Sequence, residues 1–194
     1  MRPELSELLR DLEAFGEAND AAADERSHKM LNITHDTGVF LTLLIKTGKS
    51  KNVLEIGTSN GYSTLWLADA VGEGGSVTTV EQAPHKLAMA ERNFQRAGLS
   101  TRIQQIADEA GRFIASREVG EYDFIFLDSD REQYVDWWPA LQRILADGHV
   151  LVVDNATSHA HQLVEFNRLV EATDGYLSSL CPIGKGELVI LKDT

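Results

Sequence analysis

The sequence predicts a doubly wound α/β fold in which a mostly parallel sheet ends in a C-terminal antiparallel hairpin. Strand and helix signals alternate along most of the 194 residues, as they do in proteins built from βαβ units. The segments 124–127 and 150–153 are apolar on both faces, which is typical of a parallel sheet covered by helices on both sides. After residue 172, two extended segments flank Ile183-Gly184-Lys185-Gly186, and this pattern predicts the hairpin.

The chain begins with an amphipathic helix, because apolar side chains recur at helical spacing from Leu5 to Phe15. Residues 19–27 are polar, and we expect a mobile connection there before a second helix at 36–46, closed by Gly48. Strands are expected at 52–56, 76–80, 102–106, 122–127, 149–153, 176–182 and 187–191. The remaining helices are expected at 62–71, 84–97, 109–118, 132–146 and 160–172. A single domain therefore covers residues 1–194, with residues 1–30 as a helical N-terminal extension.

The composition is that of an ordinary soluble globular protein, with 43% hydrophobic and 25% charged residues. The net charge of −12 argues against a protein that binds nucleic acids or anionic membranes. The single cysteine, Cys181, excludes an internal disulfide and favours a reducing cytoplasm. The charged N-terminus predicts no signal peptide, and the apolar stretch at 39–45 is too short to span a bilayer. We therefore expect a cytoplasmic protein whose partner is a small molecule.

Residues 53–63, Val-Leu-Glu-Ile-Gly-Thr-Ser-Asn-Gly-Tyr-Ser, form the most informative segment. An apolar strand, a glycine turn and a helix follow one another, the order that opens a nucleotide-binding βαβ unit. Gly57 and Gly61 allow a tight turn and the close approach of a ligand. Ser59 stands where a dinucleotide fingerprint needs its middle glycine, which disfavours a dehydrogenase, and Glu55 suits a cationic ligand better than a pyrophosphate. The segment closely resembles motif I of the class I S-adenosylmethionine-dependent methyltransferases.

Glu81 ends the next predicted strand, at roughly the 20-residue spacing from the glycine turn at which a carboxylate binds ribose hydroxyls. Two hydroxyls on one carboxylate make a bidentate, charge-assisted contact. Alternatively, Glu81 is an acid beside the N-terminus of the helix that begins at Pro84, where it interacts favourably with the helix dipole. Taken alone, Glu81 fits both interpretations equally, and the preceding Gly57 turn favours ribose binding.

Acidic side chains also follow the two central strands. Asp128 comes directly after the strand at 124–127, and Asp154 and Asn155 come after the strand at 150–153. Ligands of open α/β sheets bind at the edge where such strands end. Two carboxylates and an amide oxygen form a hard oxygen site suited to Mg²⁺ or another divalent cation. Each aspartate alone is more simply explained as a helix cap, and their conjunction favours a metal.

Two segments carry a second resemblance: Leu-Asp-Ser-Asp-Arg-Glu-Gln-Tyr at 127–134 and Val-Asp-Asn-Ala at 153–156. They resemble the metal motifs of the cation-dependent O-methyltransferases, a group that includes catechol and caffeoyl-CoA O-methyltransferases. The resemblance covers nearly the whole chain beyond about residue 29 and implies a seven-stranded, Rossmann-like methyltransferase sheet. It also implies that the metal ligands are Asp128, Asp154 and Asn155.

The same resemblance implies which residues surround S-adenosylmethionine. Glu55 would meet the methionine ammonium and Glu81 the ribose, while Asp108 would lie beside the adenine. The rest of the methionine part would be surrounded by Gly57, Ser63 and the Asn32-Ile33-Thr34 loop. Thr34 also has a simpler explanation, as the N-cap of the helix that follows.

Three positions depart from the family pattern. Arg131 stands where a lysine is usually proposed to take the hydroxyl proton, and a guanidinium stays protonated at neutral pH. Arg131 could instead hold a substrate carboxylate or stabilise a developing oxyanion. A separate base is then not required, because a metal itself lowers the pKa of a bound hydroxyl. Thr37 stands where plant-type relatives carry an acid near the metal. Cys181 lies about where catechol-specific enzymes use an acid, which argues against catechol itself as the acceptor. The other candidate bases are Asp130, His35, His159 and His161.

The sequence thus predicts a Mg²⁺-dependent O-methyltransferase that acts on a small aromatic acceptor with vicinal hydroxyls, with Asp128 and Arg131 as its catalytic residues. One alternative is a cofactor-binding protein without methyl transfer, and another is a metal-independent N-methyltransferase. Trp137 and Trp138 fit core packing better than an aromatic wall for the acceptor. The amphipathic N-terminal helix could pack on a second copy of the chain, so a homodimer is possible.

Overall fold

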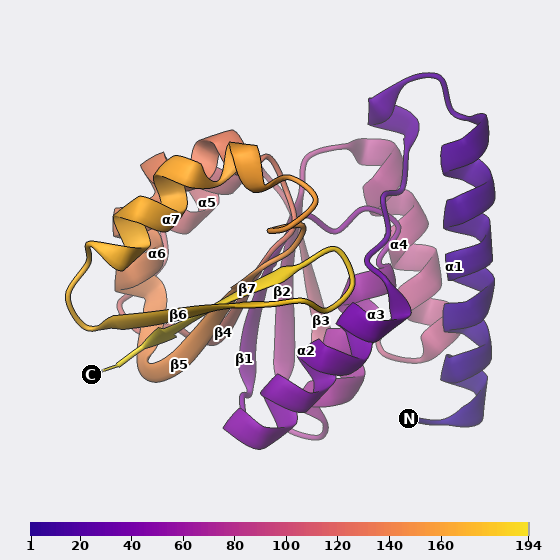
Figure 1. Ribbon diagram of the computed structural model, residues 1–194. Coiled ribbons are helices and arrows are strands. Elements are labelled where there is room, and N and C mark those ends of the chain that lie inside the picture. Colours follow the sequence, from indigo (N-terminus) through magenta and orange to yellow (C-terminus); the bar gives the residue numbers. More distant parts are fainter. Residues whose placement is uncertain (194) are drawn as a thin grey trace.

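The computed structural model describes residues 1–193 and shows a seven-stranded sheet between two layers of helices (Figure 1). The strand order is β3-β2-β1-β4-β5-β7-β6, with β1 to β5 parallel and β7 antiparallel to both β5 and β6. The strands are β1 (Asn52–Ile56), β2 (Ser76–Glu81), β3 (Ile103–Ala107), β4 (Tyr122–Leu127), β5 (Leu145–Val153), β6 (Tyr176–Cys181) and β7 (Glu187–Lys192). The predicted doubly wound fold with a C-terminal antiparallel hairpin is confirmed.

The helices divide between the two faces of the sheet, and each face has its own hydrophobic core. The first core joins α1 (Pro3–Ala22), α2 (His35–Gly48), α3 (Tyr62–Val71) and α4 (Pro84–Ala97). The second joins α5 (Ala110–Ala115), α6 (Tyr134–Ile144) and α7 (Val164–Glu171). Short 3₁₀ turns lie at η1 (Arg26–His28), η2 (Ser100–Arg102), η3 (Arg131–Gln133) and η4 (Ala160–Gln162). The apolar central strands are buried because helices cover both of their faces.

Helix α1 is longer than predicted and takes in part of the segment 19–27, which we expected to be a connection. The helix continues to Ala22, and η1 follows. The carboxylate of Asp20 accepts hydrogen bonds from the backbone N–H groups of Met30 and Leu31, at 2.6 and 2.8 Å. The amide of Asn19 donates to the carbonyl of His28 at 2.9 Å. These polar side chains, which suggested a loop, instead fasten the segment 28–31 to the helix.

The apolar face of α1 is used within the chain itself. Leu5, Leu8, Leu9 and Leu12 are buried, and α1 contacts α3 and α4. This face is therefore not free to pack on a second subunit, and a homodimer stays a prediction without that support. None of the helices in the described residues is long and apolar enough to cross a membrane.

Several element boundaries differ from the prediction by a few residues. Strand β5 begins at Leu145, inside the segment predicted as helix, because Leu145 pairs with Tyr122 of β4 across a register shift. Helix α5 is shorter than predicted, and the Glu109 side chain caps it by accepting from Gly111 N and Arg112 N. Helix α2 runs through Gly48. The residue that ends it in the left-handed conformation is Lys49, with φ of 56°.

Candidate functional site

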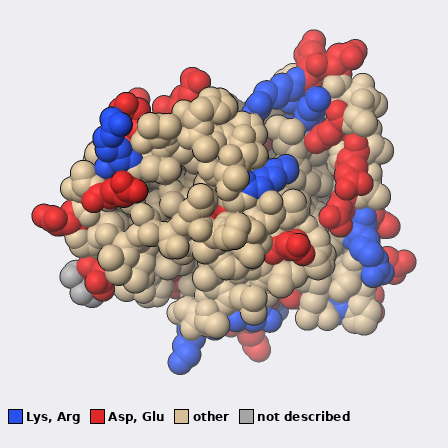
Figure 2. Space-filling view, in the orientation of Figure 1, with Lys and Arg blue, Asp and Glu red and all other residues tan. Residues whose placement is uncertain are grey.

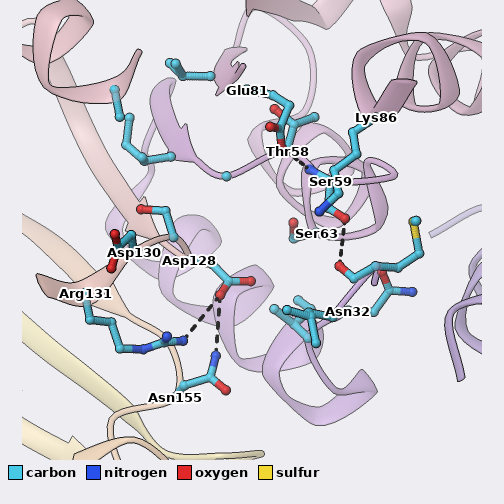
Figure 3. A pocket seen from close by; sticks show the side chains of 18 of the residues that line it. Asn32, Thr58, Ser59, Ser63, Glu81, Lys86, Asp128, Asp130, Arg131 and Asn155 are labelled. Carbon is cyan, nitrogen blue, oxygen red and sulfur yellow. Dashed lines mark hydrogen bonds and ion pairs between the residues drawn. The ribbon is translucent and has the colours of Figure 1, made fainter. Parts of the chain in front are cut away.

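A cavity of about 990 Å³ lies at the edge of the sheet where the parallel strands end. The loops that follow β1 to β5 line it, together with the segment 26–33 and the turn between β6 and β7. Figure 3 shows its interior, with Glu81 and Ser59 in one part and the cluster of Asp128, Arg131 and Asn155 in another. Most of the predicted site residues line it, namely Ile33, Gly57, Ser63, Glu81, Asp108, Asp128, Arg131 and Asn155. Glu55 and Asp154 do not.

The glycine turn after β1 has its predicted tight geometry, but neighbouring protein atoms explain the glycines. Gly57 has φ of 104°, and a Cβ there would lie 2.2 Å from the carbonyl oxygen of Asp128. Gly61 has φ of 86°, and its Cβ would lie 2.5 Å from the Phe94 ring. Ser59 adopts φ of 48°, and its hydroxyl donates to the carbonyl of Met30 at 2.7 Å. The serine in place of the middle glycine therefore fastens the segment 26–33 over the cavity.

Glu81 lies at the rim of the cavity, directly after β2. One carboxylate oxygen accepts from the Ser59 N–H at 3.1 Å, and the other accepts from Gln82 N and Ala83 N at 3.0 and 2.9 Å. The backbone therefore fixes the orientation of this half-buried carboxylate while it still faces the cavity. The two interpretations of Glu81 are compatible, because it bonds to backbone next to α4 and also lines the site.

Glu55 is buried beneath the cavity rather than inside it. Its carboxylate accepts hydrogen bonds from the hydroxyls of Thr64 and Thr79, the latter at 2.6 Å. Burial raises the pKa of Glu55 to about 7, although hydrogen bonds from Ser63, Thr64 and Thr79 oppose the shift. Ser63 itself lines the cavity. The Glu55 carboxylate is buried and does not line the cavity. Its predicted contact with a methionine ammonium stays a prediction.

Asp108, Asn32 and Ile33 line the cavity, whereas Thr34 does not, and their predicted contacts with S-adenosylmethionine stay predictions. The Asp108 carboxylate pairs with Arg112, and this hydrogen bond lowers the pKa of Asp108. Asn32 and Ile33 line the cavity. The hydroxyl of Thr34 accepts from the Thr37 N–H at 3.1 Å, which confirms Thr34 as the N-cap of α2. The segment therefore caps a helix and also borders the site.

The acidic cluster forms where β4 and β5 end side by side. Asp154 is only 1% exposed, and its two carboxylate oxygens accept from the backbone N–H and the side-chain amide of Asn155, both at 2.6 Å. The same amide reaches Asp128 Oδ1 at 3.4 Å. Asn155 has φ of 64°, a left-handed conformation that asparagine tolerates better than most residues. The structure thus brings the three predicted metal ligands together.

A third acid belongs to this cluster and was not predicted. Glu187, at the start of β7, is fully buried and accepts from the Thr37 hydroxyl at 2.8 Å. Burial, and after it the negative charge of Asp154, raises the pKa of both Glu187 and Asp128. Thr37 therefore lacks the acid of plant-type relatives but hydrogen-bonds a carboxylate from another strand. An acid opening the otherwise apolar run 187–191 was the signal in the sequence.

Arg131 is the cation of the cluster. It is 5% exposed, and its Nη2 lies 3.9 Å from Asp128 Oδ1. Its buried Nε has no hydrogen-bond partner in residues 1–193. Among the other candidate bases, Asp130 and His159 line the cavity, whereas His35 and His161 do not.

The tryptophans of α6 belong to the core, as the sequence favoured. Trp137 and Trp138 are buried in the second core, and neither lines the cavity. The indole N–H of Trp138 donates to the Thr173 hydroxyl at 3.1 Å, so burial leaves its polar atom satisfied.

No group of three or more His, Cys, Asp or Glu side chains in residues 1–193 is arranged to hold a metal ion. The candidate set consists of two carboxylates, Asp128 and Asp154, and the amide of Asn155. In the structure this amide presents its N–H groups to the carboxylates, and its oxygen accepts from the Ser158 hydroxyl at 3.2 Å.

Comparison with known proteins places this geometry in a family. The model of a family described as O-methyltransferase matches residues 5–192. A catechol O-methyltransferase of Mycobacterium tuberculosis is 36% identical over 135 residues, which cover 70% of this chain and 61% of that protein. A catechol O-methyltransferase of Niastella koreensis is 34% identical over 128 residues, which cover 64% and 58% of the two chains. The alignments thus span less than two thirds of either relative.

Solved structures show the same fold over the whole chain. A cofactor-bound structure of Rv0187 from MTB has a TM-score of 0.80 and 26% identity, covering 100% of this chain and 92% of the other. An O-methyltransferase from Bacillus cereus, in complex with SAH, has a TM-score of 0.79 and 24% identity, covering 100% and 92%. The seven-stranded sheet with its terminal hairpin is therefore a methyltransferase fold.

Proposed function

The chain belongs to the O-methyltransferase family, and from this premise we propose that it is a cytoplasmic, S-adenosylmethionine-dependent and Mg²⁺-dependent O-methyltransferase. Its acceptor would be a small aromatic molecule with vicinal hydroxyls. One observation carries the proposal: the fixed carboxylate of Glu81 and the cluster around Asp128 face the same cavity. Such a transfer needs a carboxylate that binds the ribose of the cofactor and a hard oxygen site for the cation, and both would lie at this edge of the sheet.

The residues on the cofactor side fit S-adenosylmethionine. Glu81 is held by three backbone N–H groups and still faces the cavity, so it is placed to accept ribose hydroxyls. Ser63 and Ile33 border the same space, and Asp108 lines it after β3. S-adenosylmethionine, when bound, supplies a methyl group on a positively charged sulfur.

The acidic cluster fits a hard divalent cation. Two carboxylates in one buried corner repel each other, and the raised pKa of Asp128 reflects burial together with this repulsion. A cation held by Asp128 and Asp154 would relieve that repulsion, and Asn155 would complete the set through its amide oxygen. A bound Mg²⁺ would lower the pKa of an acceptor hydroxyl and fix its position.

The chain's own residues contribute positioning and charge rather than a strong base. Arg131 stays protonated at neutral pH, so it cannot take the hydroxyl proton. Its guanidinium lies beside Asp128 in the cavity, where it can stabilise a developing oxyanion. The segment 26–33, fastened by Ser59 and Asp20, forms one wall of the cavity.

The test is the release of S-adenosylhomocysteine with a panel of vicinal diphenols, with and without a chelator. Turnover that the chelator abolishes and Mg²⁺ restores would support the proposal. Turnover unaffected by the chelator would point to a metal-independent methyltransferase. Cofactor binding without turnover on any hydroxyl or amine acceptor would point to a binding protein that has lost the chemistry.

A further inference from the structure

We propose that the acceptor carries an anionic group, a carboxylate or a phosphate, which is bound by Arg26, Lys185 and Arg131. This inference rests on the proposed function, because it names the acceptor of the same cavity. Arg131 lies beside Asp128, and Arg26 and Lys185 line the same cavity. Its basis is a convergence of cations from three distant parts of the sequence.

Lys185 stands at the tip of the β6–β7 hairpin, and the structure fixes its backbone. Its carbonyl accepts from Thr157 N and Ser158 N at 3.1 and 3.0 Å, so the turn is bonded to the loop after β5. The flanking Gly184 and Gly186 have φ of 56° and 94°. A Cβ at Gly184 would lie 2.2 Å from Thr37 Oγ1, so the turn fits tightly against α2.

The Lys185 side chain reaches the cavity from this fixed turn. Its ammonium donates to the carbonyl of Asn32 at 3.5 Å, which brings the hairpin beside the segment 26–33. No carboxylate in residues 1–193 lies within ion-pair distance of it. Lys185 is therefore an exposed cation at the cavity whose charge is available to a ligand.

Arg26 comes from the N-terminal part of the chain, where it begins η1. It lines the same cavity, and within the described residues it forms no ion pair. Its segment is held by Asp20 through Met30 and Leu31, and by the bond from Ser59 to Met30. These contacts, at Met30 and Leu31, hold the backbone that carries Arg26 beside the cavity.

Arg131 supplies the buried member of the set. More than nine tenths of this side chain is buried, and the N–H at Nε has no partner in residues 1–193. A guanidinium with an unused N–H lining a cavity is suited to an oxyanion. All three cations line the same cavity, from η1, from the turn η3 after β4 and from the β6–β7 turn.

The surrounding charges make this convergence informative. The chain has a net charge of −12, and Figure 2 shows acidic and basic side chains mainly around the periphery of one face, with some of both kinds nearer its centre. Two exposed acids, Asp130 and Glu132, line the cavity near Arg131. Asp130 is engaged in capping η3 through Glu132 N and Gln133 Nε2. Arg26 and Lys185 form no ion pair within residues 1–193, and Arg131 keeps an unused N–H at Nε beside its pair with Asp128. In an acidic protein, such cations at one cavity favour an anionic ligand.

The experiment compares acceptors that differ only in charge. Protocatechuate, its neutral primary amide and the corresponding phosphonate would be titrated into protein saturated with S-adenosylhomocysteine and Mg²⁺, and their kcat/KM values measured separately. We expect the wild type to bind at least one anion about tenfold more tightly than the amide, the effect of one charge-assisted contact. The relative affinities of protocatechuate and the phosphonate distinguish a carboxylate site from a phosphate site.

Variants assign the preference to the cations. Lys185→Gln and Arg26→Gln should each reduce the ratio of anion to amide affinity several-fold and leave amide binding unchanged. Lys46→Gln, an equal loss of charge on the exposed end of α2, should leave the ratio unchanged. Equal affinity of the wild type for both anions and the amide would overturn the inference, as would equal losses for all ligands in both variants. Because binding is measured without turnover, a failed transferase assay leaves this result interpretable.

Discussion

Replacing Glu81 tests the cofactor side of the site most directly. Its carboxylate accepts three backbone hydrogen bonds, from Ser59, Gln82 and Ala83, and lines the cavity. A hydrogen bond to a charged group contributes about 1.5–3 kcal/mol, and the lower part of that range applies because this carboxylate is only half-buried. Glu81→Ala should therefore weaken S-adenosylmethionine binding by about 1.5–2 kcal/mol, roughly 10- to 30-fold in Kd.

A second substitution separates lost charge from a disturbed turn. Glu81→Ala also leaves the Ser59 N–H without its acceptor, so part of the loss could arise from the glycine turn. Glu81→Gln keeps the size of the side chain and one acceptor oxygen, and it should lose about half as much affinity. Glu91→Ala, on the exposed face of α4, is the matched control and should bind like the wild type.

The assay is calorimetric titration of S-adenosylmethionine and S-adenosylhomocysteine, with thermal unfolding to establish that each variant is folded. A folded Glu81→Ala protein with wild-type Kd for both ligands would remove Glu81 from the cofactor site. The remaining interpretation of Glu81 would then be its bonds to the backbone before α4.

Three other substitutions test the metal, a buried acid and the hairpin. Asp154→Ala should abolish chelator-sensitive turnover while circular dichroism stays unchanged; wild-type turnover after exhaustive chelation would contradict the metal proposal. Burial raises the pKa of Glu55 from 4.5 to about 7, so its stabilising contribution is fully present below about pH 4.5 and is lost as pH rises through 7. Between about pH 4.5 and 8 the unfolding free energy of the ligand-free wild type should therefore fall by about 3 kcal/mol more than that of Glu55→Gln, as measured by urea unfolding. The same pH dependence in both proteins would refute this. Gly184→Ala, with φ of 56° and a Cβ 2.2 Å from Thr37, should lower stability by about 1–3 kcal/mol and reduce the anion preference, and unchanged unfolding would show that the turn tolerates a side chain.

The strands were predictable because burial on both faces leaves a clear signal. The segments 122–127 and 52–56 match β4 and β1 to the residue, and each is a short apolar run followed by turn chemistry. Helix ends were less predictable, since pairing decides them. Leu145 follows a helical pattern, but its pairing with Tyr122 extends β5 back to it. Local propensity carries no record of that partner.

The parts of the site on parallel strands were also predictable. Asp128 and Asp154 follow neighbouring strands, and parallel topology forces such ends to one edge. The members that were missed come from elements whose position depends on tertiary contacts. Glu187 and Lys185 belong to the antiparallel hairpin, and Arg26 lies in a segment placed by side-chain bonds from Asp20 and Ser59. No spacing rule connects these segments to the sheet edge.

The acidic cluster at this edge of the sheet lowers the stability of the fold. Asp154 and Glu187 are buried, and the partly buried Asp128 lies beside them, and burial of like charges opposes folding unless protons or cations accompany them. Arg131 is 3.9 Å from Asp128, longer than a hydrogen bond, so one guanidinium offsets only part of the repulsion. Apolar residues at the same positions would stabilise the fold more. Two of the acids follow strands that end at the cavity, so the proposed cation, if bound there, would offset this cost.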